Sequence, residues 1–471
     1  MYSGVSVGPI YKTIENVLSY KTEKTGKTRN LWAGSFIFSY IVREIIKNLI
    51  ENGVLYDDFI TPYVDENLLN EKTSVGKFHD RIIVKCNKEK LNEAIEKTKT
   101  QLAKKISKDL NTDFEDVKEF VDSYFKFYTA SYAEECNENE VLEKISEILN
   151  TKELFFEVKN YKRNYFLNWI RDFSKEYLED KFQPLHQIAV NELGIKLKYD
   201  EDLDGILKNI PHKPYHKYVA IIHADGDNLS KALQNLSIKD LSRRLFKFSN
   251  EAIRLIKDFK GEVIYAGGDD LLFFVPVKNQ KTLFSLLHNI EKIYNIENST
   301  LSFGVSITYY KYPLIEALNE SRSLLHKAKK WSYTDTDYNC EKLLNGGEEK
   351  AIKNNVAFKV VKHSGQFFTG VVHKEGKVYD KFLKFVEEDI EGEFLHSIYV
   401  KFATFKEIIK NTQDLTHFFE NNFNENYEMY KEFFEELNAF VKEVFNVYEA
   451  NEGFEFIYST LRFMKFLKGE K

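Results

Sequence analysis

Acidic residues that follow two apolar segments are the feature of this chain best suited to chemistry. The segment KYVAIIHADGDNLS ends on Asp225 and Asp227, and residues 262–277, EVIYAGGDDLLFFVPV, carry Asp269 and Asp270 between two strand-like runs. Carboxylates beside strands of Ile, Val and Phe need a compensating cation. A hairpin tip with two carboxylates, next to a strand that ends in a third, is what a divalent-metal nucleotidyl-transfer site requires.

Transfer from a nucleoside triphosphate depends mostly on positioning and on neutralising charge, for which two Mg²⁺ ions about 3.5–4 Å apart are well suited. Mg²⁺ prefers hard oxygen ligands from one or two carboxylates, phosphates and water. We therefore predict that Asp225 and Asp269 hold Mg²⁺ or Mn²⁺. Asp270 and the backbone carbonyl of Gly226 are further candidate donors, and a nucleoside triphosphate is the predicted substrate.

The residues around these acids have less specific interpretations. Gly267 and Gly268 allow a tight turn and a close approach of phosphate or ribose, but Gly and Asp are also ordinary turn residues. Asp227 alternates with Asp225, so we expect it to point to the other face of the strand and to serve as a turn or helix-start residue. Ser230 either caps the next helix or touches a phosphate, and capping is the default expectation.

The order of the surrounding elements explains how the acids meet. The pattern predicts a strand at 217–225, a helix at about 238–259, the hairpin at 262–277, a helix at about 280–294, a strand at 300–308 and a helix after Pro313. This β-α-β-β-α-β order is typical of the ferredoxin-like or palm arrangement. Its first strand lies antiparallel to the second hairpin strand, which places Asp225 next to Asp269 and Asp270.

The remainder of the 471 residues suggests an α+β protein of several domains. An early strand and a helix indicate a first α/β unit, which the family resemblance given below identifies as a first, degenerate palm, whereas the charged segment that follows has helical periodicity with almost no Gly or Pro. We predict two ferredoxin-like palms, a helical insertion and a C-terminal helical domain. The proposed ranges are 1–88 for part of the first palm, 89–212 for the mainly helical insertion, 213–370 for the second palm and 371–471 for the C-terminal domain.

Composition excludes several classes of protein. The net charge of −6 argues against a chain that binds nucleic acid over its whole surface. Cys86, Cys136 and Cys340 are isolated, which argues against a structural zinc site or a disulfide framework. No apolar run reaches membrane-spanning length and the N-terminus lacks a signal-peptide pattern, so we expect a cytoplasmic protein without a membrane partner.

Several segments resemble a known family. ADGDNLSKAL and AGGDD look like the cyclase palm of the large subunit of type III-B (Cmr) CRISPR effector complexes, which is distantly similar to GGDEF diguanylate cyclases. GPIYKTIEN, KTRNLWAGSFIFSYI, GKFHDRIIV, SFGVSITYYKYPLIEALNESRSLLHKAKK and VVKHSG resemble further segments in the right order. His79 and Asp80 depart from the family pattern. The HD-type nuclease domain of many relatives is not expected here, because the chain opens directly on the first palm.

The resemblance implies a function and a set of residue roles. The second palm would bind ATP at its junction with the first and, on engagement of target RNA, make cyclic oligoadenylate. Its partners would be the other type III-B subunits, crRNA and target RNA. Asp225 and Asp269 would be metal ligands and Asp270 would support catalysis. Lys329 would reach triphosphate oxygens, or would simply end its helix in solvent. Trp32 to Ser35 would line a nucleotide pocket, unless Trp32 packs between domains.

Three alternatives stay open at this point. The same site could join ATP to S-adenosylmethionine and give a SAM-AMP signal, as proposed for some relatives without the HD domain. The palms could instead form a non-catalytic scaffold, although retention of all three carboxylates speaks against that. A homodimeric diguanylate cyclase is disfavoured because the two palms are fused in one chain.

Overall fold

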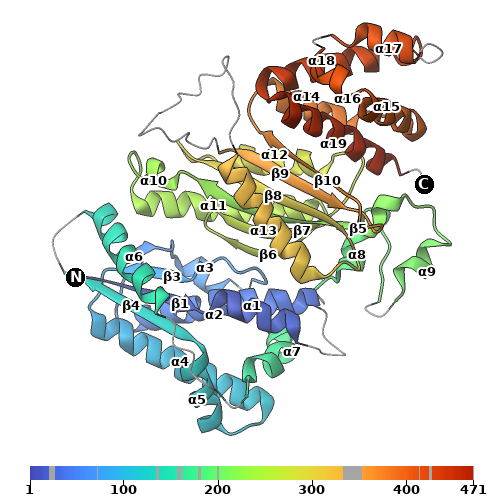
Figure 1. Ribbon diagram of the computed structural model, residues 1–471. Helices are drawn as coiled ribbons and strands as arrows, with labels where there is room; N and C mark the ends of the chain where they lie inside the picture. The colour runs from blue at the N-terminus through green and yellow to red at the C-terminus, as the bar shows by residue number, and fades with distance from the viewer. Residues whose placement is uncertain are drawn as a thin grey trace.

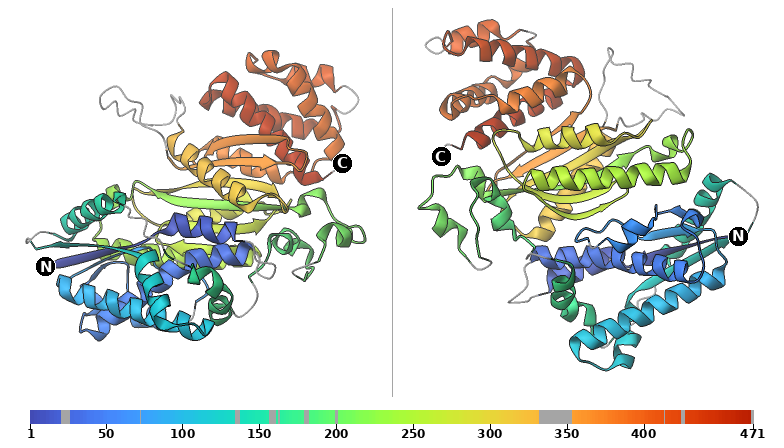
Figure 2. Two further views of the ribbon diagram at one scale, coloured as in Figure 1. Left: turned by 60° about the horizontal axis from the view of Figure 1, so that its bottom comes forward. Right: turned by 180° about the vertical axis from the view of Figure 1, so that it is seen from behind.

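The computed structural model describes residues 1–20, 27–71, 73–133, 137–155, 161, 163–178, 182–198, 201–331, 353–412, 414–423 and 427–469. Three units stack in the order first palm, second palm and C-terminal helices, from bottom to top in Figure 1 and again in both views of Figure 2. None of the helices in the described part combines the length and apolarity needed to cross a membrane. Cys86 is buried and free, and Cys136 and Cys340 lie outside the described residues.

The first palm is a four-stranded antiparallel sheet of order β2-β3-β1-β4. Its strands are β1 (Tyr2–Gly8), β2 (Phe59–Thr61), β3 (Arg81–Val84) and β4 (Lys126–Tyr132). The helices in this part of the chain are α1 (Ile10–Ser19), α2 (Lys27–Glu51), α3 (Glu66–Asn70), α4 (Lys88–Leu110), α5 (Phe114–Tyr124), α6 (Glu138–Leu154) and α7 (Tyr165–Tyr177). Read along the chain, this is the β-α-β-β-α-β order of a ferredoxin-like palm.

The structure differs from the predicted division at residue 88. Strand β4 pairs with β1 over its whole length and completes the first sheet, and α4 packs against α2 of the same palm. The segment 89–212 is thus mainly helical, as predicted, but its first part belongs to the first palm. KFYTASY contains the strand-favouring residues Phe, Thr and Tyr, but β4 is an edge strand of half-buried residues without a clear apolar alternation, so hydrophobic periodicity does not mark it.

The second palm is a six-stranded sheet of order β10-β9-β8-β5-β7-β6, in which β5 to β8 repeat the ferredoxin-like order. Its strands are β5 (Tyr218–Asp227), β6 (Glu262–Gly267), β7 (Asp270–Pro276), β8 (Thr300–Tyr309), β9 (Asn355–Val361) and β10 (Phe367–His373). The helices are α8 (Leu185–Ala189), α9 (Leu203–Leu207), α10 (Leu229–Ala232), α11 (Ile238–Asp258), α12 (Leu283–Ile293) and α13 (Leu314–Lys330). The prediction of two palms is confirmed.

Both faces of this second sheet are buried. Ala220 and Ile222 pack in the core that includes residues of α11 and α12, whereas their neighbours Val219 and Ile221 pack in the core that includes residues of α2. Because successive residues of a strand point to opposite faces, a sheet buried on both sides needs continuous apolar strands. Burial of both faces of the sheet therefore explains the uninterrupted apolar runs that precede the acidic residues in the sequence.

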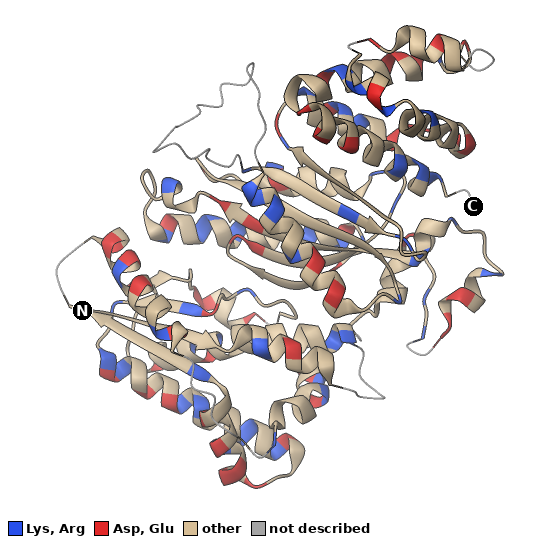
Figure 3. Ribbon diagram, in the orientation of Figure 1, with Lys and Arg blue, Asp and Glu red and all other residues tan. Residues whose placement is uncertain are grey.

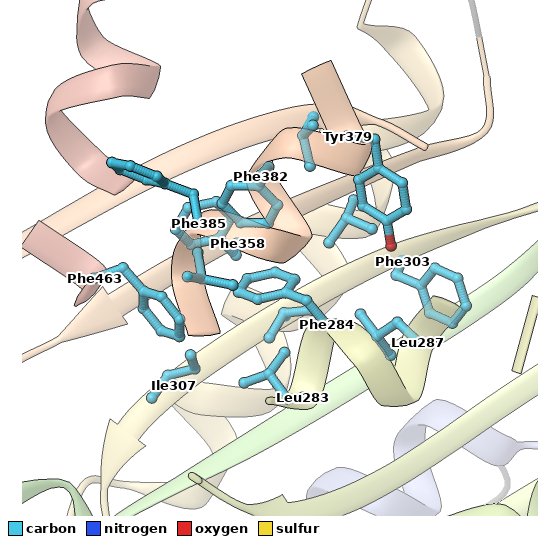
Figure 4. Close-up of a cluster of buried hydrophobic side chains, with 14 of the residues drawn as sticks. Leu283, Phe284, Leu287, Phe303, Ile307, Phe358, Tyr379, Phe382, Phe385 and Phe463 are labelled. Carbon is cyan, nitrogen blue, oxygen red and sulfur yellow. The ribbon is translucent and has the colours of Figure 1, made fainter. Parts of the chain in front are cut away.

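The C-terminal helices continue the core of the second palm. They are α14 (Lys377–Glu387), α15 (Gly392–Thr404), α16 (Lys406–Lys410), α17 (Thr416–Asn422), α18 (Lys431–Val447) and α19 (Ala450–Lys468). Figure 4 shows Phe284 of α12 among Phe358 of β9, Phe382 of α14 and Phe463 of α19. The predicted helical domain is therefore present, and it is joined to the palm by a shared aromatic core.

Candidate active site

The β6–β7 hairpin turns through a two-residue loop, Gly268 and Asp269, because Gly267 pairs with Asp270 across the ladder. Gly268 has φ +69°. A positive φ at the first loop position is what a type II′ turn needs, and glycine adopts it without strain. Gly267 lies so close to the Tyr265 ring that an added side-chain carbon would collide with the phenol. The predicted hairpin is confirmed, with both acids at its tip.

The end of β5 lies beside this tip, as the strand order predicted. β5 runs antiparallel to β7 with Ala224 opposite Leu271, so Asp225 continues next to the hairpin loop. The Gly226 N–H donates to Asp269 Oδ2 at 3.2 Å. A Cβ at position 226 would lie 2.5 Å from that oxygen and 2.8 Å from the Asp269 Cβ. Only glycine therefore permits this approach of the two strands.

Lys329 points into the acidic cluster from the C-terminal end of α13. Its ammonium donates to the Gly226 carbonyl at 2.8 Å, forms an ion pair with Asp225 Oδ2 and lies 3.6 Å from Asp227 Oδ1. The interpretation of Lys329 as a merely solvated helix end is wrong. Contact with triphosphate oxygens stays a prediction.

Two expectations about the residues after Asp225 are wrong. Asp227 does not point to the opposite face, because residues two apart in a strand share a face and Lys329 lies near both acids. Ser230 does not cap a helix: Asn228, with φ +56°, precedes α10, and Ser230 lies inside that short helix with its side chain exposed.

Asp227 is instead a buried anchor for the strand end. It is fully buried, and its Oδ2 accepts hydrogen bonds from Thr300 Oγ1 at 3.0 Å, Ser302 Oγ at 2.8 Å and the Asn354 N–H at 3.0 Å. These donors come from β8 and from the entry to β9. A carboxylate oxygen that already accepts three hydrogen bonds is held in place, so Asp227 fixes the end of β5 from behind.

A buried ion pair lies behind this anchor. The Lys374 ammonium is inaccessible to solvent and lies 2.6 Å from Glu291 Oε1 of α12. Burial lowers the pKa of Lys374, while the charges of Glu291 and Asp227 act in the opposite direction. The negative charge of Asp227 is therefore shared between Lys329 on the open side and Lys374 on the buried side.

The clustered carboxylates perturb one another. Burial raises the pKa of Asp269 to about 6, and the charge of Asp225 contributes in the same direction. Desolvation by the surrounding protein, followed by the charges of Asp269 and Asp225, raises the pKa of Asp270 well above its ordinary value, although this side chain keeps access to solvent at the rim. Lys329 opposes both shifts. A further cation at the cluster would favour the ionised form of both acids.

The donor set fits Mg²⁺ that arrives with a triphosphate. Within the described ranges, no three His, Cys, Asp or Glu side chains are arranged to hold a metal ion by themselves. Mg²⁺ does not need such a cage, because it is commonly held by one or two carboxylates together with substrate phosphates and water. Asp225 and Asp269 present hard oxygens at the same end of the sheet, and the Gly226 carbonyl accepts a hydrogen bond from Lys329, which also pairs with Asp225.

A cavity of about 450 Å³ lies between the hairpin tip and the first palm. Gly267 to Asp270 line one side, and Thr61, His79 and Asp80 are among the residues on the other. Burial and the nearby Arg81 lower the pKa of His79 to about 4, so this ring is neutral at pH 7, and it lies 2.9 Å from Thr61 Oγ1. Sequence reasoning noted His79 and Asp80 only as a departure from a family pattern and missed their place in this cavity.

Trp32 packs in the core and does not line that cavity. It is fully buried, stacks on Phe36 with ring centroids 4.9 Å apart, and donates from Nε1 to the Ser74 carbonyl at 2.5 Å. Phe173 of α7 and Phe182 complete its surroundings. Of the two interpretations given above for Trp32, the structure agrees with packing, and the neighbours named here belong to the first palm and to the segment that includes α7.

Two ferredoxin-like palms, one of which carries clustered carboxylates at a hairpin tip, define a nucleotide-cyclase-like double-palm protein. Residues 2–119 match the family described as CRISPR-associated protein Cmr2, N-terminal, and residues 218–336 match Cas10/Cmr2, second palm domain. The two matches together cover about half of the chain. The chain belongs to the Cas10/Cmr2 family.

Individual relatives agree with this assignment. The CRISPR system Cmr subunit Cmr2 of Pyrococcus furiosus is 27% identical over 220 residues, which cover 35% of this chain and 25% of that protein. The match thus spans a quarter of the relative's length. Among solved structures, the type III-B Cmr-beta complex in its apo state and bound to cognate target RNA contains chains that match with TM-scores of 0.51 and 0.53. These matches have 13% and 12% identity, cover 87% and 90% of this chain and 75% and 78% of those chains, and support the fold.

Proposed function

We propose that this chain transfers adenylyl groups from ATP at the acidic tip of the second palm and so makes cyclic oligoadenylate. The observation that carries the proposal is the convergence of Asp225, Asp269 and Asp270 at the end of β5 and the hairpin tip, where Asp269 and Asp270 border the cavity between the palms. A volume of about 450 Å³ lies within the usual range of small-molecule sites.

The chemistry follows from charge. A ribose hydroxyl oxygen of one nucleotide forms a bond to the α-phosphorus of an ATP, the bond to the β-phosphate oxygen breaks, and pyrophosphate leaves with that electron pair. Mg²⁺ held by Asp225 and Asp269 would offset the charge on the attacking and leaving oxygens. Lys329, already at hydrogen-bonding distance from this edge, would contact the triphosphate. Asp270, whose pKa is raised, would accept the hydroxyl proton.

We further propose that the chain works within a type III-B CRISPR complex, with the other subunits, crRNA and target RNA as partners. The support is its family and its structural likeness to a chain of the Cmr-beta complex bound to cognate target RNA. In this setting, binding of target RNA would switch on nucleotide synthesis.

The decisive experiment is the double variant Asp269→Asn plus Asp270→Asn in the reconstituted complex with target RNA. Asparagine keeps the shape of each side chain and removes its charge, so product formation from ATP should be lost while RNA binding is retained. The matched control, Glu251→Gln plus Asp258→Asn, removes two exposed carboxylates from α11 and should leave synthesis unchanged. Normal synthesis by the site variant would refute the proposal.

The same reactions identify the acceptor. Incubation with ATP alone and with ATP plus S-adenosylmethionine, followed by mass spectrometry, separates cyclic oligoadenylate from a SAM-AMP conjugate. If a SAM-AMP conjugate forms and its formation requires Asp269, the proposed site would be correct but the product would not be cyclic oligoadenylate. A wild-type complex that binds no Mg²⁺-ATP would indicate a scaffold.

A further inference from the structure

A second cavity, far from the acidic tip, lies between the β9–β10 hairpin and the C-terminal helices. Its volume is about 730 Å³. Its lining combines cations with aromatic rings and contains no acidic residue: Lys362, Phe367, Tyr399, Tyr458, Arg462 and Lys465. Figure 3 shows the basic positions at the end of α19, next to the C-terminus. This composition differs from the mixed charges of the rest of the chain.

In the part of the chain that the structure describes, the three cations of this cavity lack carboxylate partners. Lys468, which follows on the same helix, pairs with Asp389, and Lys406 and Lys384 pair with Glu455 and Glu436. No carboxylate in the described part of the chain forms an ion pair with Lys362, Arg462 or Lys465. Burial, followed by the charges of Arg462 and Lys465, lowers the pKa of Lys362. Cations held together without an acid leave an uncompensated positive potential.

Neutral contacts hold these side chains in place. Arg462 Nη1 donates to the Phe367 carbonyl at 3.2 Å, and its guanidinium lies 4.9 Å from the Phe368 ring. Lys465 Nζ donates to the Gly392 carbonyl at 3.1 Å. Because carbonyls and rings carry no net charge, they position the cations without neutralising them. The site is therefore pre-organised for an anion.

The aromatic residues offer surfaces for a flat group. Phe367 is 57% exposed at the end of the hairpin, and the Lys359 ammonium lies 4.7 Å from the centroid of its ring. Tyr399 and Tyr458 lie with ring centroids 6.0 Å apart on the facing helices α15 and α19. A nucleic-acid strand carries anionic phosphates and planar bases, which match the cations and the aromatic rings of this cavity.

We propose that this cavity binds a single strand of nucleic acid, with phosphates on Lys362, Arg462 and Lys465 and a base on Phe367. Positive grooves with aromatic platforms are the general means by which proteins bind unpaired strands. The proposal is independent of the chemistry at the acidic tip, because it uses other residues on another face. RNA and DNA strands share this chemistry, and the test separates them.

The test measures binding of the full-length chain to fluorescent oligouridylate of about 12 nucleotides by anisotropy at several salt concentrations. The variant Lys362→Gln plus Lys465→Gln should bind more weakly, and the slope of log K against log salt should shrink by about 1.4, or about 0.7 for each lost phosphate contact. Lys384→Gln plus Lys431→Gln removes equal charge from the same domain outside the cavity and should keep the slope. Oligothymidylate replaces the RNA in a parallel series.

The aromatic contact has its own variant. Phe367→Ala removes an exposed side chain, so the fold is retained, and affinity should fall by about fivefold to 150-fold, the range for one base stacked on an aromatic ring, with the salt slope unchanged. If Lys362→Gln plus Lys465→Gln showed the same salt slope as the control Lys384→Gln plus Lys431→Gln, the proposal would be overturned. Competition by UMP as strong as that by the oligomer would also overturn it, because the site would then take a free nucleotide. Binding of oligothymidylate with the same dependence on the lysines would support it.

Discussion

Replacing Gly226 by alanine tests how closely the two acidic strands must approach. A Cβ at this position would lie 2.5 Å from Asp269 Oδ2 and 2.8 Å from both the Asp269 Cβ and the Tyr294 hydroxyl. The Tyr294 hydroxyl is itself held by Ser299 Oγ at 2.9 Å, which in turn donates to the Asp227 carbonyl at 2.6 Å. The phenol therefore cannot yield easily, and Asp269 has to move.

The size of the effect follows from these distances. An ordinary contact with a Cβ is no shorter than about 3.4 Å, so the Asp269 carboxylate must shift by about 1 Å and loses its hydrogen bond to the Gly226 N–H. A misplacement of about 1 Å in a reacting group costs about 100-fold in rate, or about 2.7 kcal/mol. Overpacking costs about 1–3 kcal/mol of stability, which a domain of ordinary stability tolerates.

The assay is pyrophosphate release from ATP by the reconstituted complex, with thermal unfolding as the check on folding. Gly8→Ala is the matched control, because a Cβ at position 8 meets no atom within 4 Å. We expect Gly226→Ala to lose about 100-fold in turnover with a folded structure, and the control to retain full turnover. Turnover of Gly226→Ala within about threefold of wild type would show that the position of Asp269 does not limit the reaction.

Three further predictions follow from the site and its surroundings. Burial raises the pKa of Asp269 to about 6 in the folded chain, so between about pH 4 and pH 6 the folded state binds a proton that the unfolded state has released. The free energy of unfolding, measured by urea titration, should therefore fall as pH rises through this range. The fall should be smaller in the variant Asp269→Asn. Lys374→Met leaves the partly exposed Glu291 carboxylate without its cation and should cost about 3 kcal/mol in the same assay, the low end for breaking a buried pair, with part of the loss recovered when Glu291→Gln is added. Trp32→Phe removes the hydrogen bond to the Ser74 carbonyl and should lower the melting temperature without changing the Kd for Mg²⁺-ATP. A higher Kd in this variant would instead indicate that Trp32 takes part in nucleotide binding.

The meeting of the acids could be predicted from sequence because it depends only on strand order. In a ferredoxin-like sheet the first strand lies beside the third, so Asp225 had to reach the tip that carries Asp269 and Asp270, and the pairing of β5 with β7 confirms this. Strand β4 was missed for the opposite reason. Its half-buried residues pair at an edge with β1, far away in sequence, and show no clear apolar alternation.

The other half of the site could not be predicted, because it depends on how one palm sits on the other. The Ala266 N–H donates to the Gly76 carbonyl at 3.1 Å, which joins the hairpin to the loop before β3. This contact brings His79 and Asp80 to the cavity. No periodicity or motif encodes such a docking, so those two residues looked like an unexplained departure in an apolar strand.

The Asp-Gly-Asp sequence at the end of β5 divides three tasks among three adjacent residues. Asp225 keeps solvent access, with a third of its side chain exposed, and it forms an ion pair with Lys329, which under the proposed function a metal ion would replace. Gly226 lets Asp269 approach from the neighbouring hairpin. The Asp227 Oδ2 accepts hydrogen bonds from donors on β8 and at the entry to β9, so Asp227 holds the end of the strand in place.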